Sequence, residues 1–193
     1  MELSILQETV ELLLQGERET ARERIIGSAP FMPIEPQGRR YSETEKMRVF
    51  FRDGFVDRYS GKRLVNPGIL RCITYFFPED FPYHPHWKMS QCHRAYWELF
   101  PTIDHIVPVA RGGQDVPENW VTTSMLNNSI KANWTLEELR WELCAGGALT
   151  EWDGLTKQFL SLAEAVPEVL TDPYIRRWHH VSSAATRRAD DTD

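Results

Sequence analysis

Residues 100–134 read FPTIDHIVPVARGGQDVPENWVTTSMLNNSIKANW, and the order of residue types in this stretch decides the fold. A short apolar run closes on an adjacent acid and base, Asp104 and His105. A turn-rich loop with two glycines follows, then Asn119, a β-prone run at 120–123 and the polar start of a helix. The pattern predicts a strand, a loop, a second strand and a helix in succession.

Two oxygen-bearing side chains and one imidazole in this frame suit chemistry on a phosphate. Asp104 offers a carboxylate and Asn128 a side-chain carbonyl, and these are the hard oxygen ligands that magnesium prefers. A bound divalent metal polarises a phosphoryl oxygen and stabilises the leaving oxygen. An unperturbed imidazole titrates near neutral pH, so His105 can take a proton from an attacking water. The residue types therefore predict phosphodiester hydrolysis.

The spacing also sets geometric requirements for such a site. Adjacent strand residues point to opposite faces, so Asp104 and His105 can approach one phosphate only where the strand ends and the chain bends. Asn119 is placed to bond backbone in the loop that carries His105 and so to fix the ring. Lys131 follows Asn128 by one helical turn, where it can contact a phosphate or be solvated. Taken singly, each of these residues is better explained as a turn or cap residue, and only their joint spacing favours the site.

These residues resemble a known family, the ββα-metal or HNH endonucleases. The resemblance covers about 35 of the 193 residues. It rests on Asp-His-Ile-Val-Pro at 104–108, Gly-Gly at 112–113, an Asn fourteen residues after the His, and Asn-x-x-Lys at 128–131.

In that family the first Asp and the last Asn or His bind the metal, the His is the general base, and the middle Asn is structural. The resemblance implies that Asp104 and Asn128 bind Mg²⁺ or Mn²⁺, that His105 is the catalytic base, and that Asn119 orients it. The products would be 5′-phosphate and 3′-hydroxyl ends.

Many members of the family also carry two Cys-x-x-Cys pairs that bind a structural zinc. The corresponding segments here read DRYSGK at 57–62 and SMLNN at 124–128, and the three cysteines form no such pair. We therefore expect a variant without the zinc knuckle, in which aromatic packing replaces the metal. The available aromatic residues are Tyr59, Trp87, Trp97, Phe100, Trp120 and Trp134.

A second cluster of potential metal ligands lies in a proline-broken segment that is rich in aromatic residues. The cluster contains His84, His86, Cys92 and His93. Its spacing matches no standard zinc site, so polar or packing roles are favoured, with DNA contact by His84 or His86 as a lesser alternative.

Charge is unevenly distributed along the chain. The net charge of −6 counts mildly against a nonspecific nucleic-acid binder. Residues 38–63, however, contain eight basic and four acidic side chains, a local charge of +4. A solvated helix face explains any one of these charges equally well. The candidates for nucleic-acid contacts are Arg48, Arg52, Lys62, Arg63, Arg111 and Lys131.

The N-terminal sequence shows no basic leader with an apolar core, and no apolar run is long enough to span a bilayer. Three scattered cysteines fit a reducing compartment. These features predict a cytoplasmic protein that does not enter a membrane.

The remaining chain predicts an α+β fold that is mainly helical around the ββα motif and its short antiparallel hairpin. Four regions are expected: N-terminal helices with a Pro-rich linker at 1–37, a nuclease core at 38–145, C-terminal helices at 146–180, and a disordered tail at 181–193. The expected elements are one or two helices at 3–26 broken near Gly16, a linker or strap at 27–41, a helix at 42–52 capped by Ser42 and Glu45, a hairpin at 56–66, and helices at 67–77, 135–144, 155–166 and 173–180.

The leading hypothesis is a magnesium- or manganese-dependent endonuclease acting on double-stranded DNA, with restriction and phage defence among its conceivable roles. One alternative is a module that binds nucleic acid or protein on the same frame without cutting. Another is an RNase or a toxin-type nuclease. Double-strand cutting with one active site per chain would favour a homodimer, with the N-terminal helices as its interface.

Overall fold

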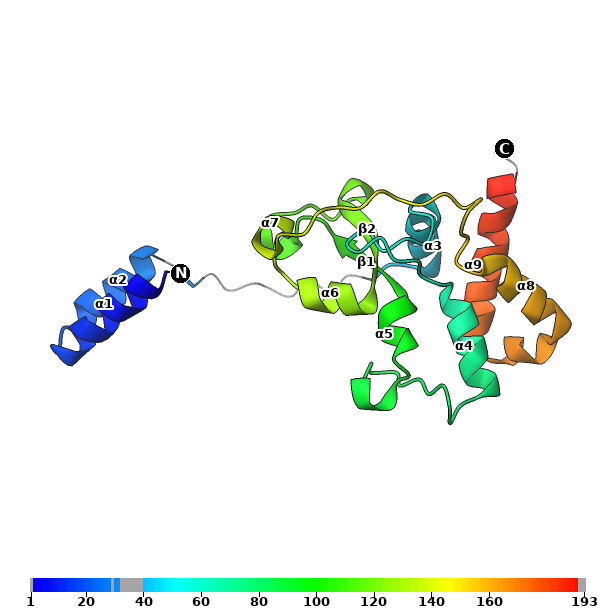
Figure 1. Ribbon diagram of the computed structural model, residues 1–193, viewed down its shortest axis with the longest axis horizontal. Coiled ribbons are helices and arrows are strands. Elements are labelled where there is room, and N and C mark those ends of the chain that lie inside the picture. Colours follow the sequence, from blue (N-terminus) through cyan, green and yellow to red (C-terminus); the bar gives the residue numbers. More distant parts are fainter. Residues whose placement is uncertain (1, 29, 32–39, 191–193) are drawn as a thin grey trace. The chain divides into compact units, whose positions relative to one another are not determined.

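The computed structural model describes residues 2–28, 30–31 and 40–190, and the chain divides into two compact units, Met1–Arg39 and Arg40–Asp193 (Figure 1). Most of the expected linker at 27–41 lies outside the described residues. No helix in the described ranges combines the length and the apolar content that crossing a bilayer requires.

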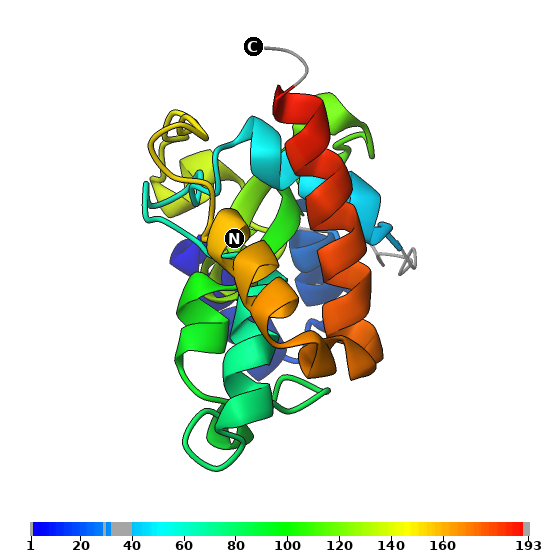
Figure 2. The same cartoon turned by 90° about the vertical axis from the view of Figure 1, so that its right-hand side faces the viewer.

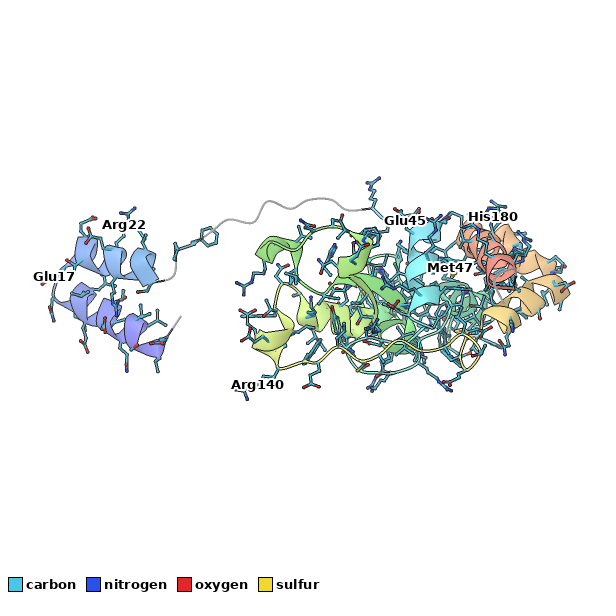
Figure 3. The ribbon with its side chains drawn as sticks, turned by 90° about the horizontal axis from the view of Figure 1, so that it is seen from above. Glu17, Arg22, Glu45, Met47, Arg140 and His180 are labelled. Atoms are coloured by element: carbon cyan, nitrogen blue, oxygen red, sulfur yellow. The ribbon has the colours of Figure 1, made fainter. Side chains whose placement is uncertain are left out.

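The first unit is a pair of short helices. Helix α1 spans Leu3–Leu14 and α2 spans Arg18–Ser28, and the two lie side by side (Figure 3). Gly16 in the connection has a φ of +83°, a left-handed conformation that glycine adopts without strain. The predicted break near Gly16 is confirmed. Among the described residues of this unit, only Thr9 and Ala21 are buried.

The second unit is mainly helical and contains a two-stranded antiparallel sheet, so the chain has an α+β fold. Its elements in chain order are α3 (Glu43–Arg52), α4 (Pro67–Phe76), η1 (Met89–Gln91), α5 (Ala95–Leu99), β1 (Pro101–His105), η2 (Val109–Arg111), η3 (Pro117–Asn119), β2 (Trp120–Ser124), α6 (Met125–Lys131), α7 (Leu136–Leu139), α8 (Thr156–Ala165), η4 (Pro167–Thr171) and α9 (Pro173–Asp190).

The strand, loop, strand and helix expected at 100–134 are β1, the η2–η3 loop, β2 and α6. The strands pair antiparallel, and the last pair of the ladder places His105 opposite Trp120. Helix α6 begins directly after β2, where the Ser124 hydroxyl accepts a hydrogen bond from the Asn127 backbone N–H at 3.1 Å. Because no connection separates them, α6 folds back onto both strands.

The hydrophobic core of this unit lies among α3, α4, α8 and α9 (Figure 2). Phe50 of α3, Phe159 of α8 and Trp178 of α9 are buried there. Asn66, which caps α4, donates a hydrogen bond to the buried Ser182 hydroxyl at 2.9 Å. This bond attaches the middle of α9 to the start of α4.

Helix α9 is longer than the sequence predicted. We expected a helix ending near His180 and a disordered tail at 181–193, but α9 continues to Asp190. The prediction was wrong because the polar composition of this segment hides a buried stripe: Val181 and Ala185 pack against the core, and Ser182 is fully buried. Residues 191–193 lie outside the described residues.

Helix α7 is shorter than predicted. A capping box forms between Thr135 and Glu138, but the helix ends at Leu139 instead of near residue 144. Arg140 adopts a left-handed φ of +56°, and the chain from there to residue 148 contains no helix. Long-range backbone hydrogen bonds outweigh the local helix propensity here. For example, the Cys144 N–H donates to the Arg58 carbonyl at 2.7 Å.

Gly147 lies where two backbone segments touch. The Gly147 N–H donates to the Asp53 carbonyl at 3.0 Å. A Cβ on Gly54 would lie only 2.2 Å from the Gly147 carbonyl oxygen. Glycine is therefore required where these two backbone segments touch.

Other expected elements form with small differences. The Ser42–Glu45 capping box at the start of α3 is confirmed, and so are α4 and α8 within one or two residues. The hairpin expected at 56–66 is reduced to a single antiparallel bridge between Val56 and Arg63 around a turn.

Candidate active site

Asp104 projects from β1, and its mostly buried carboxylate interacts with protein groups through one oxygen only among the described residues. The Tyr59 hydroxyl donates to Oδ2 at 2.7 Å, and the Lys131 ammonium lies 3.0 Å from the same atom. Lys131 is fully buried and also donates to the His105 carbonyl at 2.7 Å. Burial and the Asp104 charge raise the pKa of Tyr59, so its phenol remains a donor. Oδ1 of Asp104 accepts no hydrogen bond from the described residues.

The Asn128 amide reaches the same face of β1 from α6. Its Nδ2 donates to the Thr102 hydroxyl at 3.0 Å and to the Ile103 carbonyl at 3.4 Å. Thr102 and Asp104 are two residues apart on the strand, so their side chains project from one face. Within the described chain, Oδ1 of Asn128 receives no hydrogen bond. Helix α6 thus brings Asn128, and Lys131 one turn later, over the face from which Asp104 projects.

The His105 ring is held by a different set of groups. Its Nε2 lies 2.8 Å from Oδ1 of Asp115 and 3.3 Å from the Tyr41 hydroxyl. The same Asp115 oxygen accepts from the Tyr41 hydroxyl at 2.7 Å and from the Trp120 indole N–H at 2.8 Å. Burial alone would raise the pKa of Asp115, but the hydrogen bonds from Tyr41, His105 and Trp120 lower it below its usual value. No hydrogen bond between described residues links this ring to Asp104.

Asn119 closes the loop that carries His105. Its Oδ1 accepts from the Val107 N–H at 2.9 Å, and its Nδ2 donates to the carbonyls of Val107 and Gln114, each at 2.9 Å. A Cβ on Gly113 would lie 1.9 Å from the Val107 carbonyl oxygen, so only glycine fits beside this amide. The predicted bond between Asn119 and the loop backbone is confirmed.

A buried carboxylate that the sequence analysis missed joins the turn at 57–61 to the start of α6. Asp57 accepts from the Tyr59 N–H at 2.9 Å, the Thr123 hydroxyl at 3.1 Å, the Ser124 N–H at 3.0 Å and Nδ2 of Asn127 at 2.8 Å. It is almost fully buried. Three of these donors, from Thr123, Ser124 and Asn127, connect the turn at 57–61 to the start of α6.

Asp53, four residues earlier in the sequence, makes a similar connection to β2. Its Oδ2 accepts from the Thr122 N–H at 2.7 Å, and its carboxylate is paired with Arg52 and Arg58. Asp53 and Asp57 thus accept hydrogen bonds from alternate backbone N–H groups along the outer edge of β2, where no further strand of the described residues pairs. We expected aromatic packing in place of the zinc, and the Tyr59 ring does lie 5.5 Å from the Trp141 ring. Hydrogen bonds to these two carboxylates, which we did not expect, connect the segments. One signal was present in the sequence, because Asp57 occupies the first position of the compared Cys-x-x-Cys segment.

Of the six basic residues predicted to contact nucleic acid, four are already engaged by protein groups of the described chain and two are not. Arg52 donates to the carbonyls of Pro117 and Trp120, and Lys131 is buried as described above. Arg63 lies over the Trp152 ring, and Arg111 pairs with Glu138. Within the described residues, Arg48 and Lys62 make no side-chain hydrogen bond, and both are exposed.

The second group of potential metal ligands does not converge on one point. The His84 N–H donates to Sγ of Cys92 at 3.1 Å, and the His93 ring stacks on Phe81 with centroids 4.2 Å apart. Across the described ranges, no group of three or more His, Cys, Asp and Glu side chains is arranged to hold a metal ion.

Comparison of the chain with models of known protein families, with curated protein sequences and with solved structures gave no match. The interpretation of the site therefore rests on its own geometry and on the residue pattern at 100–134.

Proposed function

We propose that this protein is a metal-dependent endonuclease that hydrolyses phosphodiester bonds in DNA, built on a ββα-metal motif formed by β1, β2 and α6. The observation that carries the proposal is the approach of Asn128, from α6, to the face of β1 that presents Asp104. These residues are separated by the whole loop and the second strand, and the same pattern places His105 next to Asp104.

The donor set fits magnesium or manganese. Asp104 and Asn128 each retain one oxygen without a hydrogen-bond donor among the described residues, and both are hard oxygen ligands of the type these ions prefer. Lys131 opposes binding, because its ammonium already lies 3.0 Å from the carboxylate. We therefore expect weak affinity in the free protein and stronger affinity when a substrate phosphate completes the coordination.

The residues divide the chemistry among them. A magnesium or manganese ion held by Asp104 and Asn128 would supply polarisation of the phosphoryl oxygen and stabilisation of the leaving oxygen. His105 accepts a proton from the attacking water, whose oxygen bonds to phosphorus as the bond to the 3′ oxygen breaks. The 3′ oxygen leaves as a hydroxyl after protonation, and the phosphate remains on the 5′ end. Tyr59 and Lys131 keep the Asp104 carboxylate in a fixed orientation.

The buried Lys131–Asp104 pair favours a second candidate function. With the carboxylate neutralised by an ammonium, the same frame can bind nucleic acid or a partner protein without cutting. Nicking of supercoiled plasmid in the presence of Mg²⁺ or Mn²⁺, with EDTA as the control, separates the two functions. Parallel digestion of single-stranded RNA and of modified and unmodified DNA identifies the substrate and tests the RNase or toxin alternative.

The surface residues suggest where DNA would contact the protein. Arg48 and Lys62 are the two candidate cations whose side chains make no hydrogen bond within the described part of the chain. We propose them as phosphate contacts in preference to Arg52, Arg63 and Arg111, which protein groups already engage.

Asn128→Ala should weaken the metal dependence of cleavage. The substitution removes one of two protein oxygens, so the Mg²⁺ concentration for half-maximal nicking should rise by about tenfold or more. Ser129→Ala, on the exposed side of the same helix, is the matched control and should leave the metal titration unchanged. An Asn128→Ala protein with the wild-type Mg²⁺ titration would remove Asn128 from the metal site.

The N-terminal helices are proposed as a homodimer interface. A pair of helices of this length is marginally stable in isolation, and its apolar side chains remain exposed within the described unit. In a dimer, the helix pairs of two chains can bury each other's apolar side chains and bring two active sites onto one duplex. The exposed residues are Leu3, Leu6, Val10, Leu13, Leu14, Ile25 and Ile26.

Light scattering during gel filtration should therefore report a dimer of the full chain. Replacing both Leu6 and Leu13 with glutamate should produce a monomer, because each dimer would then bury four additional charges. The surface variant Gln7→Glu is the matched control and should remain dimeric. A monomeric wild-type chain, or a dimeric double variant, would refute this interface.

A further inference from the structure

The hydrogen bonds around His105 define which ring nitrogen carries a proton. A carboxylate only accepts hydrogen bonds, so the 2.8 Å contact between Oδ1 of Asp115 and Nε2 of His105 requires a proton on Nε2. The Tyr41 hydroxyl gives its own proton to Asp115 at 2.7 Å, so it has none to donate to Nε2. The neutral ring must then accept through Nδ1, which has no hydrogen-bond partner among the described residues.

We propose that Asp115 is the positioning residue for His105. It accepts the Nε2 proton, holds the neutral ring in the Nε2–H tautomer, and leaves the lone pair of Nδ1 to accept the proton of the attacking water. Asp115 acts through the imidazole and not on the substrate. This inference rests on the proposed function of His105 as the general base.

Asp115 is itself held in place by its surroundings. The Trp120 indole N–H donates to the same oxygen at 2.8 Å, and Trp120 is the residue paired with His105 in the strand ladder. Asn119 bonds the carbonyl of Gln114, the residue directly before Asp115. The loop bonded by Asn119 therefore places the carboxylate and the ring in one fixed arrangement.

The carboxylate also prepares the ring for proton transfer. When Nδ1 gains a proton the imidazole becomes a cation, and the adjacent negative charge stabilises that cation. In a ring without such a partner, the two neutral tautomers interchange, and a fraction of molecules presents an N–H where a lone pair is needed.

The test compares Asp115→Asn with Asp115→Leu. The asparagine carbonyl can still accept the Nε2 proton, whereas leucine offers no acceptor. We expect Asp115→Leu to lower kcat for plasmid nicking by about 10- to 100-fold with little change in KM, as for other partners that orient an imidazole. Asp115→Asn should recover most of the loss. The exposed loop variant Glu118→Ala is the matched control and should cut normally.

A spectroscopic measurement reports the tautomer independently of cleavage. Two-bond ¹H–¹⁵N correlation spectra of the metal-free protein, recorded where the ring is neutral, should show Nε2–H in the wild type and in Asp115→Asn. Asp115→Leu should show a mixture of both tautomers. An Nδ1–H ring in the wild type, or an unchanged tautomer in Asp115→Leu, would overturn the inference.

The two readouts separate failure of the inference from failure of the proposed function. If the wild type cuts no nucleic acid but the tautomers follow the expected pattern, the endonuclease proposal fails and the positioning geometry stands. If the wild type cuts DNA and Asp115→Leu cuts equally fast, Asp115 is not a positioning residue. If Asp115→Leu does not fold, the wild-type spectrum alone still decides the tautomer.

Discussion

His105→Ala should reduce metal-dependent cleavage of DNA by at least about 10²- to 10⁴-fold, the range that a positioned general base contributes. The substitution removes the only group in the proposed mechanism that accepts the proton of the attacking water. The ring lies at the end of β1, where its loss leaves the backbone ladder intact. DNA binding and thermal stability should therefore change little, and single-turnover nicking rates measured beside DNA affinity test this expectation.

Two controls make the His105→Ala result specific. His180→Ala removes an exposed imidazole from α9, and it should cut at the wild-type rate (Figure 3). Imidazole added to the buffer should restore part of the activity of His105→Ala, because the small molecule can occupy the space of the missing ring. Cleavage by His105→Ala at the wild-type rate would show that another group is the base.

Asp57→Ala should lower the free energy of unfolding by about 3–5 kcal/mol, because several buried donors lose their acceptor at about 1–3 kcal/mol each. Four donors converge on this carboxylate, and two of them are backbone N–H groups of Tyr59 and Ser124. Without the carboxylate these groups stay buried and lose their acceptors. Urea denaturation followed by tryptophan fluorescence measures the change.

The matched control is Asp80→Ala, which removes an exposed carboxylate from a turn and should alter stability by less than about 0.5 kcal/mol. Asp57→Asn should also destabilise, because its amide N–H₂ group would face donors instead of accepting from them. If the free energy of unfolding of Asp57→Ala lies within about 1 kcal/mol of the wild-type value, these hydrogen bonds do not hold the turn against α6 as we describe.

The elements that the sequence predicted correctly are those with local signals. Ser42 and Glu45 form a capping box within four residues, and α3 starts there. The apolar run before Asp104, the glycine loop and Asn119 lie within a single hairpin, so their mutual arrangement follows from the strand ladder. The bond from Asn119 to the loop backbone was predictable for the same reason.

The features that the sequence did not predict depend on contacts between distant segments. The polar end of α9 is helical because Ser182 bonds Asn66, which is 116 residues earlier. Three of the four donors to Asp57 come from residues 66 to 70 positions later, and no local sequence pattern indicates such partners. Asp115 lies in a loop whose path depends on the close approach of Gly113 to the Val107 carbonyl. In each case, tertiary packing outweighs local propensity.

The central claim is that Asp104 and Asn128 bind one divalent ion. The most direct measurement is anomalous diffraction from Mn²⁺ in crystals of the His105→Ala variant bound to an uncleaved DNA duplex. Our account predicts a single strong peak about 2.0–2.3 Å from one oxygen of each of these side chains and close to a DNA phosphate. A manganese ion bound by other residues, or none at Asp104 while Lys131 keeps its ion pair, would contradict it.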